Sequence, residues 1–213
     1  MQLDKLTFRE LDQKWIAIDR KKDIKKINKR LKKKFSYEPI IGYIYIDHEN
    51  GIGIRIGGHV IKENNHYSLE EEVVKEQLKI EYNEKINFHV TILNDDIASA
   101  IKGSTQIEID CQKYYEDQAI NDSRKEEILD EFRHEYYPDD LEVLLTTNKD
   151  EEFLWTRINA YSPKHKVAVC TLISDSLYNK DYKESLQVFA KIEEDGKNII
   201  LKLDKPIKQK EQS

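Results

Sequence analysis

Residues 40 to 61 carry the pattern that most constrains how this chain of 213 residues folds. Ile40, Ile44 and Ile46 alternate with Ile41, Tyr43 and Tyr45, a pattern typical of a strand covered on both faces. Asn50-Gly51 follows, which is the strongest short signal for a hairpin turn, and isoleucine then alternates with glycine or arginine. We therefore predict a hairpin over residues 40–61, with a two-residue turn in which Asn50 and Gly51 both have positive φ.

The segments on either side of this hairpin predict further helices and strands. Apolar residues spaced three to four apart predict an N-terminal helical segment from residue 3 to residue 35, ended by Pro39. Ser68 and Glu71 match a capping box. The elements expected after the hairpin are a helix over 69–82, a strand over 86–93, a short helix over 95–102 and a strand over 105–111.

The C-terminal half has a different pattern, with residues 113–140 as the boundary. A helix carrying Ile128, Leu129 and Phe132 is expected there, capped by residues 121–123. Strands are then expected over residues 141–147, 153–161, 166–174, 185–192 and 198–203. The predicted fold class is α+β: an N-terminal basic helix, an α+β region containing the β-hairpin, and a mainly antiparallel β-sheet as the C-terminal half.

This pattern predicts two domains. Residues 1–118 would form an α+β domain that begins with a basic helical segment. Residues 119–213 would form a domain of one helix, a mainly antiparallel sheet and a polar tail.

Composition excludes several classes of protein. The longest stretch without Asp, Glu, Lys or Arg is nine residues, 86–94, whereas a membrane-spanning helix needs about 20 apolar residues. The first twenty residues hold no apolar block of the secretory type. Two cysteines, Cys111 and Cys170, are too few for a disulfide scaffold. We expect a cytoplasmic protein, and the abundance of Ile and Lys, which have AT-rich codons, favours a low-GC bacterium or its phage.

Basic residues are concentrated near the N-terminus. Residues 1–35 hold thirteen Lys and Arg against five Asp and Glu, and ten of these cations fall within residues 20–34. One hypothesis is that this segment binds the phosphates of a nucleic acid or another anionic surface. The other is that it docks an apolar stripe on the acidic remainder of the chain. The candidate contact residues are Lys25, Lys26, Lys29, Arg30 and Lys33.

A short motif around His89 has a catalytic counterpart. Phe88-His89-Val90-Thr91-Ile92-Leu93 resembles the His-x-Thr signature of two-histidine phosphoesterases. The resemblance covers six residues and implies that His89 is one of two histidines acting as general acid and base on a phosphodiester. His66-Tyr67-Ser68-Leu69 is the only second stretch that could supply the other histidine, and we interpret it as a helix cap.

Trp155 and Arg157 share one face of a predicted strand. Both residue types are enriched where interfaces concentrate their binding energy, so the pair is a candidate partner-binding site. The alternative places Trp155 in the core and Arg157 at the sheet edge.

No complete catalytic, cofactor or metal-binding constellation can be assembled from the sequence. It therefore favours a non-catalytic protein that binds another protein, either of immunity or inhibitor type or an accessory factor of a phage or mobile element. Nucleic-acid binding through residues 20–34 ranks second, and a phosphoesterase using His89 ranks third.

Overall fold

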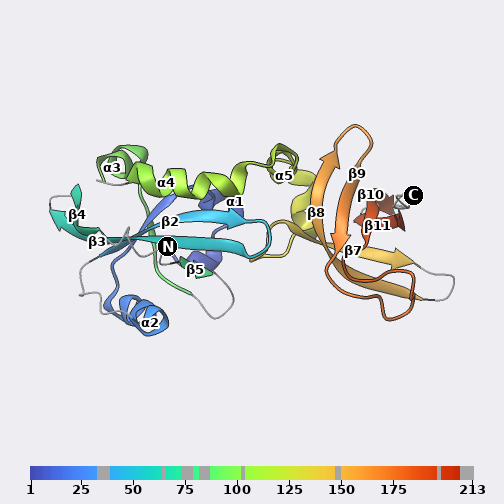
Figure 1. The fold of residues 1–213 in the computed structure, drawn as a ribbon, viewed down its shortest axis with the longest axis horizontal. Coiled ribbons are helices and arrows are strands. Elements are labelled where there is room, and N and C mark those ends of the chain that lie inside the picture. The colour runs from blue at the N-terminus through green and yellow to red at the C-terminus, as the bar shows by residue number, and fades with distance from the viewer. Residues whose placement is uncertain are drawn as a thin grey trace, which may run out of the picture. The chain divides into compact units, whose positions relative to one another are not determined.

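The chain divides into two compact units, Met1–Glu116 (unit 1) and Asp117–Ser213 (unit 2). The computed structural model describes residues 1–32, 39–63, 66–72, 79–81, 87–101, 104–146, 150–195 and 198–206. The predicted α+β class is confirmed, including the mainly antiparallel sheet of the C-terminal half (Figure 1). No helix in the described part of the chain is both long and apolar enough to cross a membrane.

Unit 1 is built on a six-stranded sheet in which β4, β3, β2, β1 and β6 follow one another, and β5 also pairs with β3. The strands are β1 (Trp15–Ile18), β2 (Ile40–Asp47), β3 (Gly51–Glu63), β4 (His66–Glu72), β5 (Lys79–Glu81) and β6 (Thr91–Ile92). The helices and 3-10 turns are η1 (Leu3–Lys5), α1 (Phe8–Leu11), α2 (Lys21–Leu31), α3 (Asp95–Ala100), α4 (Ser104–Gln112) and η3 (Lys113–Tyr115).

The predicted hairpin is the centre of this sheet, as β2 and β3. Its register pairs Ile44 with Ile54, and Asp47 with Gly51. The predicted two-residue turn is wrong, because residues 48–50 all lie between the last paired residues. Only Gly51 has positive φ, at 73°, and Asn50 does not. The physical reason is the Asp47 side chain, whose Oδ1 accepts the backbone N–H groups of Glu49 and Asn50 and so stabilises the longer turn.

Both faces of the sheet are covered. Trp15, Tyr43 and Tyr45 lie on the face that packs against α3 and α4, in a cluster that includes Ile107 and Cys111. Helix α2 lies on the opposite side of the sheet from α3 and α4 (Figure 1). Burial on both faces explains why β2 has no polar alternation.

Gly53 and Tyr45 show how tightly the α4 face is packed. A Cβ atom at Gly53 would lie 2.4 Å from the Tyr45 ring, and that ring stacks on Tyr114 with centroids 4.5 Å apart. The ring is thus held between the strand and Tyr114, so only a glycine fits at position 53.

Three of the predicted elements of unit 1 are wrong in type. The continuous helix over 3–35 is interrupted by strand β1, whose four residues are all buried. The prediction of a helix over 69–82 is wrong, because Ser68 and Glu71 lie in strand β4 and residues 79–81 form β5. Residues 73–78 and 82 lie outside the described residues. The strand over 105–111 is the helix α4. In it Ile107 and Cys111, four residues apart, are buried, whereas Ile109 is 60% exposed.

Of three other predicted elements, two differ from the structure and one is confirmed. The strand expected over 86–93 is reduced to β6, with an isolated bridge at His89, because strand pairing with β1 covers only two residues. The short helix over 95–102 is confirmed as α3. The helix expected to carry Ile128, Leu129 and Phe132 is instead α5 (Gln118–Arg124) followed by the 3-10 turn η4 (Glu127–Phe132).

Unit 2 is a closed five-stranded barrel with the order β10-β11-β7-β8-β9. All five predicted strands are present, as β7 (Asp140–Thr146), β8 (Glu151–Ser162), β9 (Val167–Leu172), β10 (Gln187–Asp195) and β11 (Asn198–Pro206). Neighbouring strands are antiparallel, and the barrel closes through a parallel pairing of β11 with β7. Side chains alternate between the apolar interior and the surface. Every second residue of β8 therefore faces outward on a rigid scaffold.

Candidate functional site

Two surfaces of the protein carry the residues that the sequence singled out. One is the outer side of α2 in unit 1, and the other is the outer side of β8 in unit 2.

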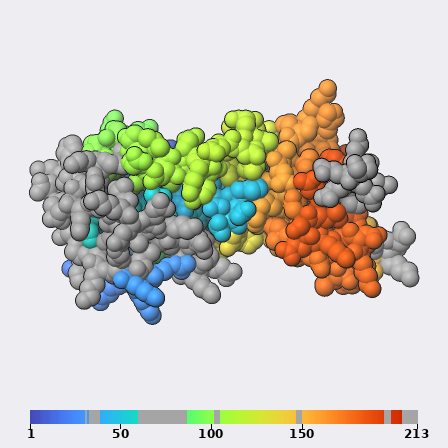
Figure 2. All heavy atoms as spheres, in the orientation of Figure 1, coloured from blue at the N-terminus to red at the C-terminus, as the bar shows by residue number. Residues whose placement is uncertain are grey.

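Helix α2 is strongly amphipathic because its cations and its apolar residues occupy opposite sides. Ile24, Ile27 and Asp23 are buried, whereas the helix exposes six cations. These exposed residues are Lys21, Lys22, Lys25, Lys26, Lys29 and Arg30. The blue atoms of this segment lie at the surface of unit 1 (Figure 2). The helix is thus docked by its apolar side, and its cations face solvent.

The exposed cations of α2 differ in their pairing. Lys26 lies 3.4 Å from the buried Asp23 carboxylate and donates a hydrogen bond to the backbone oxygen of Asn87. Among the described residues, no carboxylate pairs with Lys25, Lys29 or Arg30. We call these three residues, together with Lys22, the basic face. Lys33 lies outside the described residues, so its predicted role remains a prediction.

His89 lies beside the N-terminal end of this helix. Its backbone N–H donates to the buried Asp23 Oδ2 at 3.1 Å. Burial lowers the pKa of the His89 imidazole from its ordinary value, and the positive charges of Arg20 and the N-terminal amine lower it further.

The sheet does not bring His89 and His66 together. His66 is in β4 and the His89 segment leads into β6, and these strands are at opposite edges of the β4-β3-β2-β1-β6 order. Four strand spacings separate those edges, about 19 Å in a regular sheet. Two catalytic histidines must reach one phosphate, so this arrangement does not supply the pair that the phosphoesterase resemblance implies.

Trp155 lies on the outer surface of the barrel, not in its core. It is 36% exposed, and Phe153, two residues earlier on the same face of β8, is 65% exposed. The alternative interpretation of Trp155 as a core residue is therefore wrong. The inward positions of β8 are already filled by Leu154, Thr156 and Ile158.

The segment before β7 packs His134 against Trp155, and Tyr136 and Tyr137 pack in turn against His134. The His134 ring lies 5.1 Å from the Trp155 ring, edge to face, and 5.2 Å from the Tyr137 ring. Tyr136 is the third neighbour, with its ring 5.9 Å from His134. We call Phe153, Trp155, His134, Tyr136 and Tyr137 the aromatic face. No local pattern of residues indicates that residues 134–137 would lie near Trp155, because the contact depends on how β7 pairs with β8.

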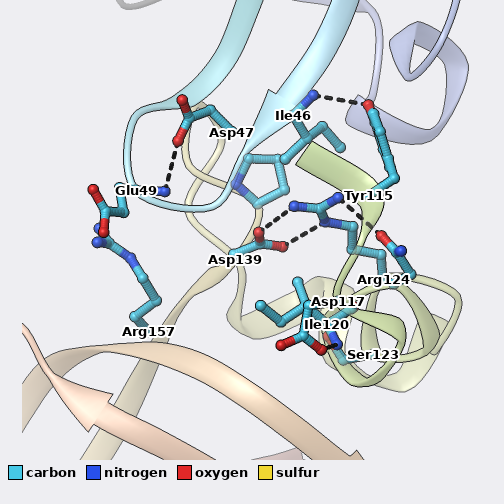
Figure 3. A network of polar contacts seen from close by, with 12 residues as sticks. Ile46, Asp47, Glu49, Tyr115, Asp117, Ile120, Ser123, Arg124, Asp139 and Arg157 are labelled. Carbon is cyan, nitrogen blue, oxygen red and sulfur yellow. Dashed lines mark hydrogen bonds and ion pairs between the residues drawn. The ribbon is translucent and has the colours of Figure 1, made fainter. Parts of the chain in front are cut away.

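A buried ion pair holds this segment in place (Figure 3). Arg124, at the end of α5, donates from Nε to Asp139 Oδ1 at 2.9 Å and from Nη2 to Asp139 Oδ2 at 2.6 Å. Their side chains are only 5% and 2% exposed. Helix α5 is capped by Asp117, whose Oδ1 accepts the N–H groups of Ala119 and Ile120. The aromatic segment is therefore tied to a capped helix by a bidentate, charge-assisted contact.

Arg157 pairs with a carboxylate on the neighbouring strand. Its Nε donates to Asp140 Oδ1 at 2.8 Å, across the β7–β8 ladder. Burial raises the pKa of the Asp140 carboxyl, although the hydrogen bond from Arg157 opposes that shift. Of the predicted pair, Trp155 is thus the exposed contact, and Arg157 contributes by neutralising a buried carboxylate.

The two cysteines are both buried and carry free thiols. Cys170 lies in β9 as expected, whereas Cys111 lies in helix α4 and not in a strand. Burial raises the pKa of the Cys111 thiol to about 11 and that of the Cys170 thiol to about 12, which makes both poor nucleophiles. Within the described ranges, no group of three or more His, Cys, Asp and Glu side chains could hold a metal ion.

Comparisons with known proteins identify no relative. No protein-family model, no curated protein and no solved structure matches the chain.

Proposed function

We propose that this protein is a non-catalytic binding protein that recognises another protein through the aromatic face of unit 2. The observation that carries the proposal is the exposure of Phe153 and Trp155 side by side on one barrel strand. Large exposed apolar side chains that lie together are typical of interaction sites, and tryptophan is enriched among residues that dominate binding energy.

The rigidity of the surroundings supports this proposal. Trp155 is in the middle of a strand paired on both sides, and the segment 134–137 is held by the Arg124–Asp139 pair. A side chain that is already ordered loses little conformational entropy when a partner binds. The aromatic face therefore has the preorganisation that a specific interface needs.

We further propose a cytoplasmic location in a bacterium or a phage-infected cell, with an immunity, inhibitor or accessory role. The support is the pair of free, buried thiols, which suits a reducing compartment. A toxin gene next to this gene would favour the immunity role, and replication genes would favour an accessory role.

Site-specific photo-crosslinking tests the binding proposal. A photoreactive phenylalanine analogue replaces Phe153 in one variant and Leu177 in the control, since Leu177 is 84% exposed but lies in the loop between β9 and β10. In an extract of the source organism we expect a discrete protein adduct from position 153 that is lost when Trp155→Ala is added. Identical adducts from both positions would contradict the proposal.

A second candidate function, nucleic-acid binding, is favoured by the exposed cations of the basic face, for which the described part of the chain holds no carboxylate partner. Its test is a gel-shift series on duplex DNA and RNA against salt concentration, with the triple variant K25E, K29E and R30E. If each of these cations contacts a phosphate, the slope of log affinity against log salt falls by about 0.9 per residue on duplex DNA. The matched control reverses three exposed lysines of unit 2: Lys164, Lys180 and Lys183. No retardation at low salt, or equal loss in both triple variants, would exclude this function.

A further inference from the structure

Carboxylates dominate the part of the chain that forms the aromatic face. Residues 117–157 hold thirteen Asp and Glu against five Lys and Arg, whereas residues 158–213 hold eight against ten. The negative charge of unit 2 is therefore concentrated in residues 117–157, the part of the chain that includes residues 134–137 and the first half of β8.

The arginines of this segment are used internally. Arg124 is paired with Asp139 and Arg157 with Asp140. Arg133 donates to the backbone oxygens of Pro138 and Ser123 and lies 3.2 Å from Asp130. Each of the three arginines therefore has a partner within unit 2.

Three exposed carboxylates remain beside the aromatic face. Glu142 is directly opposite Trp155 in the β7–β8 register, Glu151 is on the same face of β8 as Phe153, and Glu135 lies between His134 and Tyr136 in the chain. No described side chain forms an ion pair or hydrogen bond with any of these three. Cross-strand neighbours have Cβ atoms about 5 Å apart, so a group bound over Trp155 is within reach of Glu142.

From this arrangement we infer that the aromatic face binds a basic peptide segment of the partner protein, with a Lys or Arg side chain over Trp155. An indole ring attracts a cation to its face, and Glu142 neutralises the same cation. The apolar stem of the cation then packs on Phe153. A nucleic acid is disfavoured here because its phosphates would meet Glu142, Glu151 and Glu135.

This inference rests on the proposed function, and a peptide-library selection tests it separately. The full-length protein selects from a random twelve-residue display library, and the Lys and Arg content of the bound peptides is compared with the input. We expect enrichment of Lys and Arg, and we expect it to disappear with W155A and to persist with L177A. Peptides that depend on Trp155 but are neutral or acidic would overturn the inference and leave the proposed function standing.

Variants that remove the carboxylates but keep the aromatic rings give a second test, in which the affinity for a basic peptide is measured. For one selected basic peptide labelled with fluorescein, W155A should weaken the affinity about 30-fold, and E142Q with E151Q about two- to five-fold for each carboxylate. The effect of E142Q should vanish at high salt. An unchanged affinity in E142Q/E151Q would overturn the inference. The inference would also be overturned if the free protein associated with itself and both W155A and K25E/K29E/R30E abolished that association. The group bound to the aromatic face would then be the α2 helix of a second copy.

Discussion

Removing the Asp139 carboxylate should destabilise unit 2 more than any surface substitution. In Asp139→Ala the guanidinium of Arg124 stays buried but loses its two hydrogen bonds to the carboxylate, at 2.9 and 2.6 Å, and keeps the longer one to Asn121 Oδ1. Breaking a buried ion pair from one side typically costs about 3–5 kcal/mol, because the remaining charge has lost its carboxylate partner in a site that water hardly reaches. With a urea dependence of about 2 kcal/mol per molar, the unfolding midpoint should fall by about 1.5–2.5 M.

Alkylation of the two cysteines at increasing urea concentration, read by mass spectrometry, measures this loss. Cys170 is fully buried in the barrel and reports the opening of unit 2, and Cys111 reports unit 1 in the same sample. The Cys170 curve should shift to lower urea in Asp139→Ala.

The double variant Arg124→Leu/Asp139→Leu separates charge from packing. It leaves no unpaired charge, so its cost should be well below the sum of the two single substitutions. A loss below about 1 kcal/mol in Asp139→Ala would refute the reasoning that this pair holds the segment carrying the aromatic face.

Two further predictions concern packing and pH. Gly53→Ala should lower the free energy of unfolding by about 1–3 kcal/mol, because the new methyl group meets a Tyr45 ring that Tyr114 prevents from moving. Urea unfolding followed through Cys111 alkylation measures this loss. An unchanged unfolding midpoint would contradict the packing described. The free energy of unfolding should also fall as the pH rises from 9 towards 12, since the unfolded thiols ionise near 9 while Cys111 and Cys170 hold their protons to about 11 and 12. Measuring the free energy of unfolding at pH 8 and at pH 9.5 tests this. Cys170→Ala is the control, in which the free energy of unfolding should depend less on pH.

The sequence predicted the strands that lie between clear turn signals and missed β1, β4 and β5. Strands β7 to β11 alternate inward and outward residues between clear turns, so all five were predicted. Strand β1 has four buried residues in a row, and its apolar side chains also match helical spacing, which is why it was assigned to a helix. Helix α4 was mistaken for a strand because Ile107, Ile109 and Cys111 mimic alternation, although Ile109 is exposed.

The candidate site was predictable only in part, for a related reason. That Trp155 and Arg157 share a face follows from strand periodicity alone. Which face is outward depends on barrel closure, and the approach of His134 and Glu142 to Trp155 depends on the register of β7 against β8. Such long-range pairing is not encoded in any local pattern of residue types.

The most direct test of the central claim is the affinity of the captured partner for the full-length protein, measured by isothermal titration calorimetry with wild type, W155A and L177A. The aromatic face predicts that W155A weakens binding by about 30-fold or more, as the loss of a central interface residue does. It also predicts that L177A binds like wild type, since this equally apolar and more exposed side chain lies outside the aromatic face. Equal affinities of wild type and W155A would contradict the account.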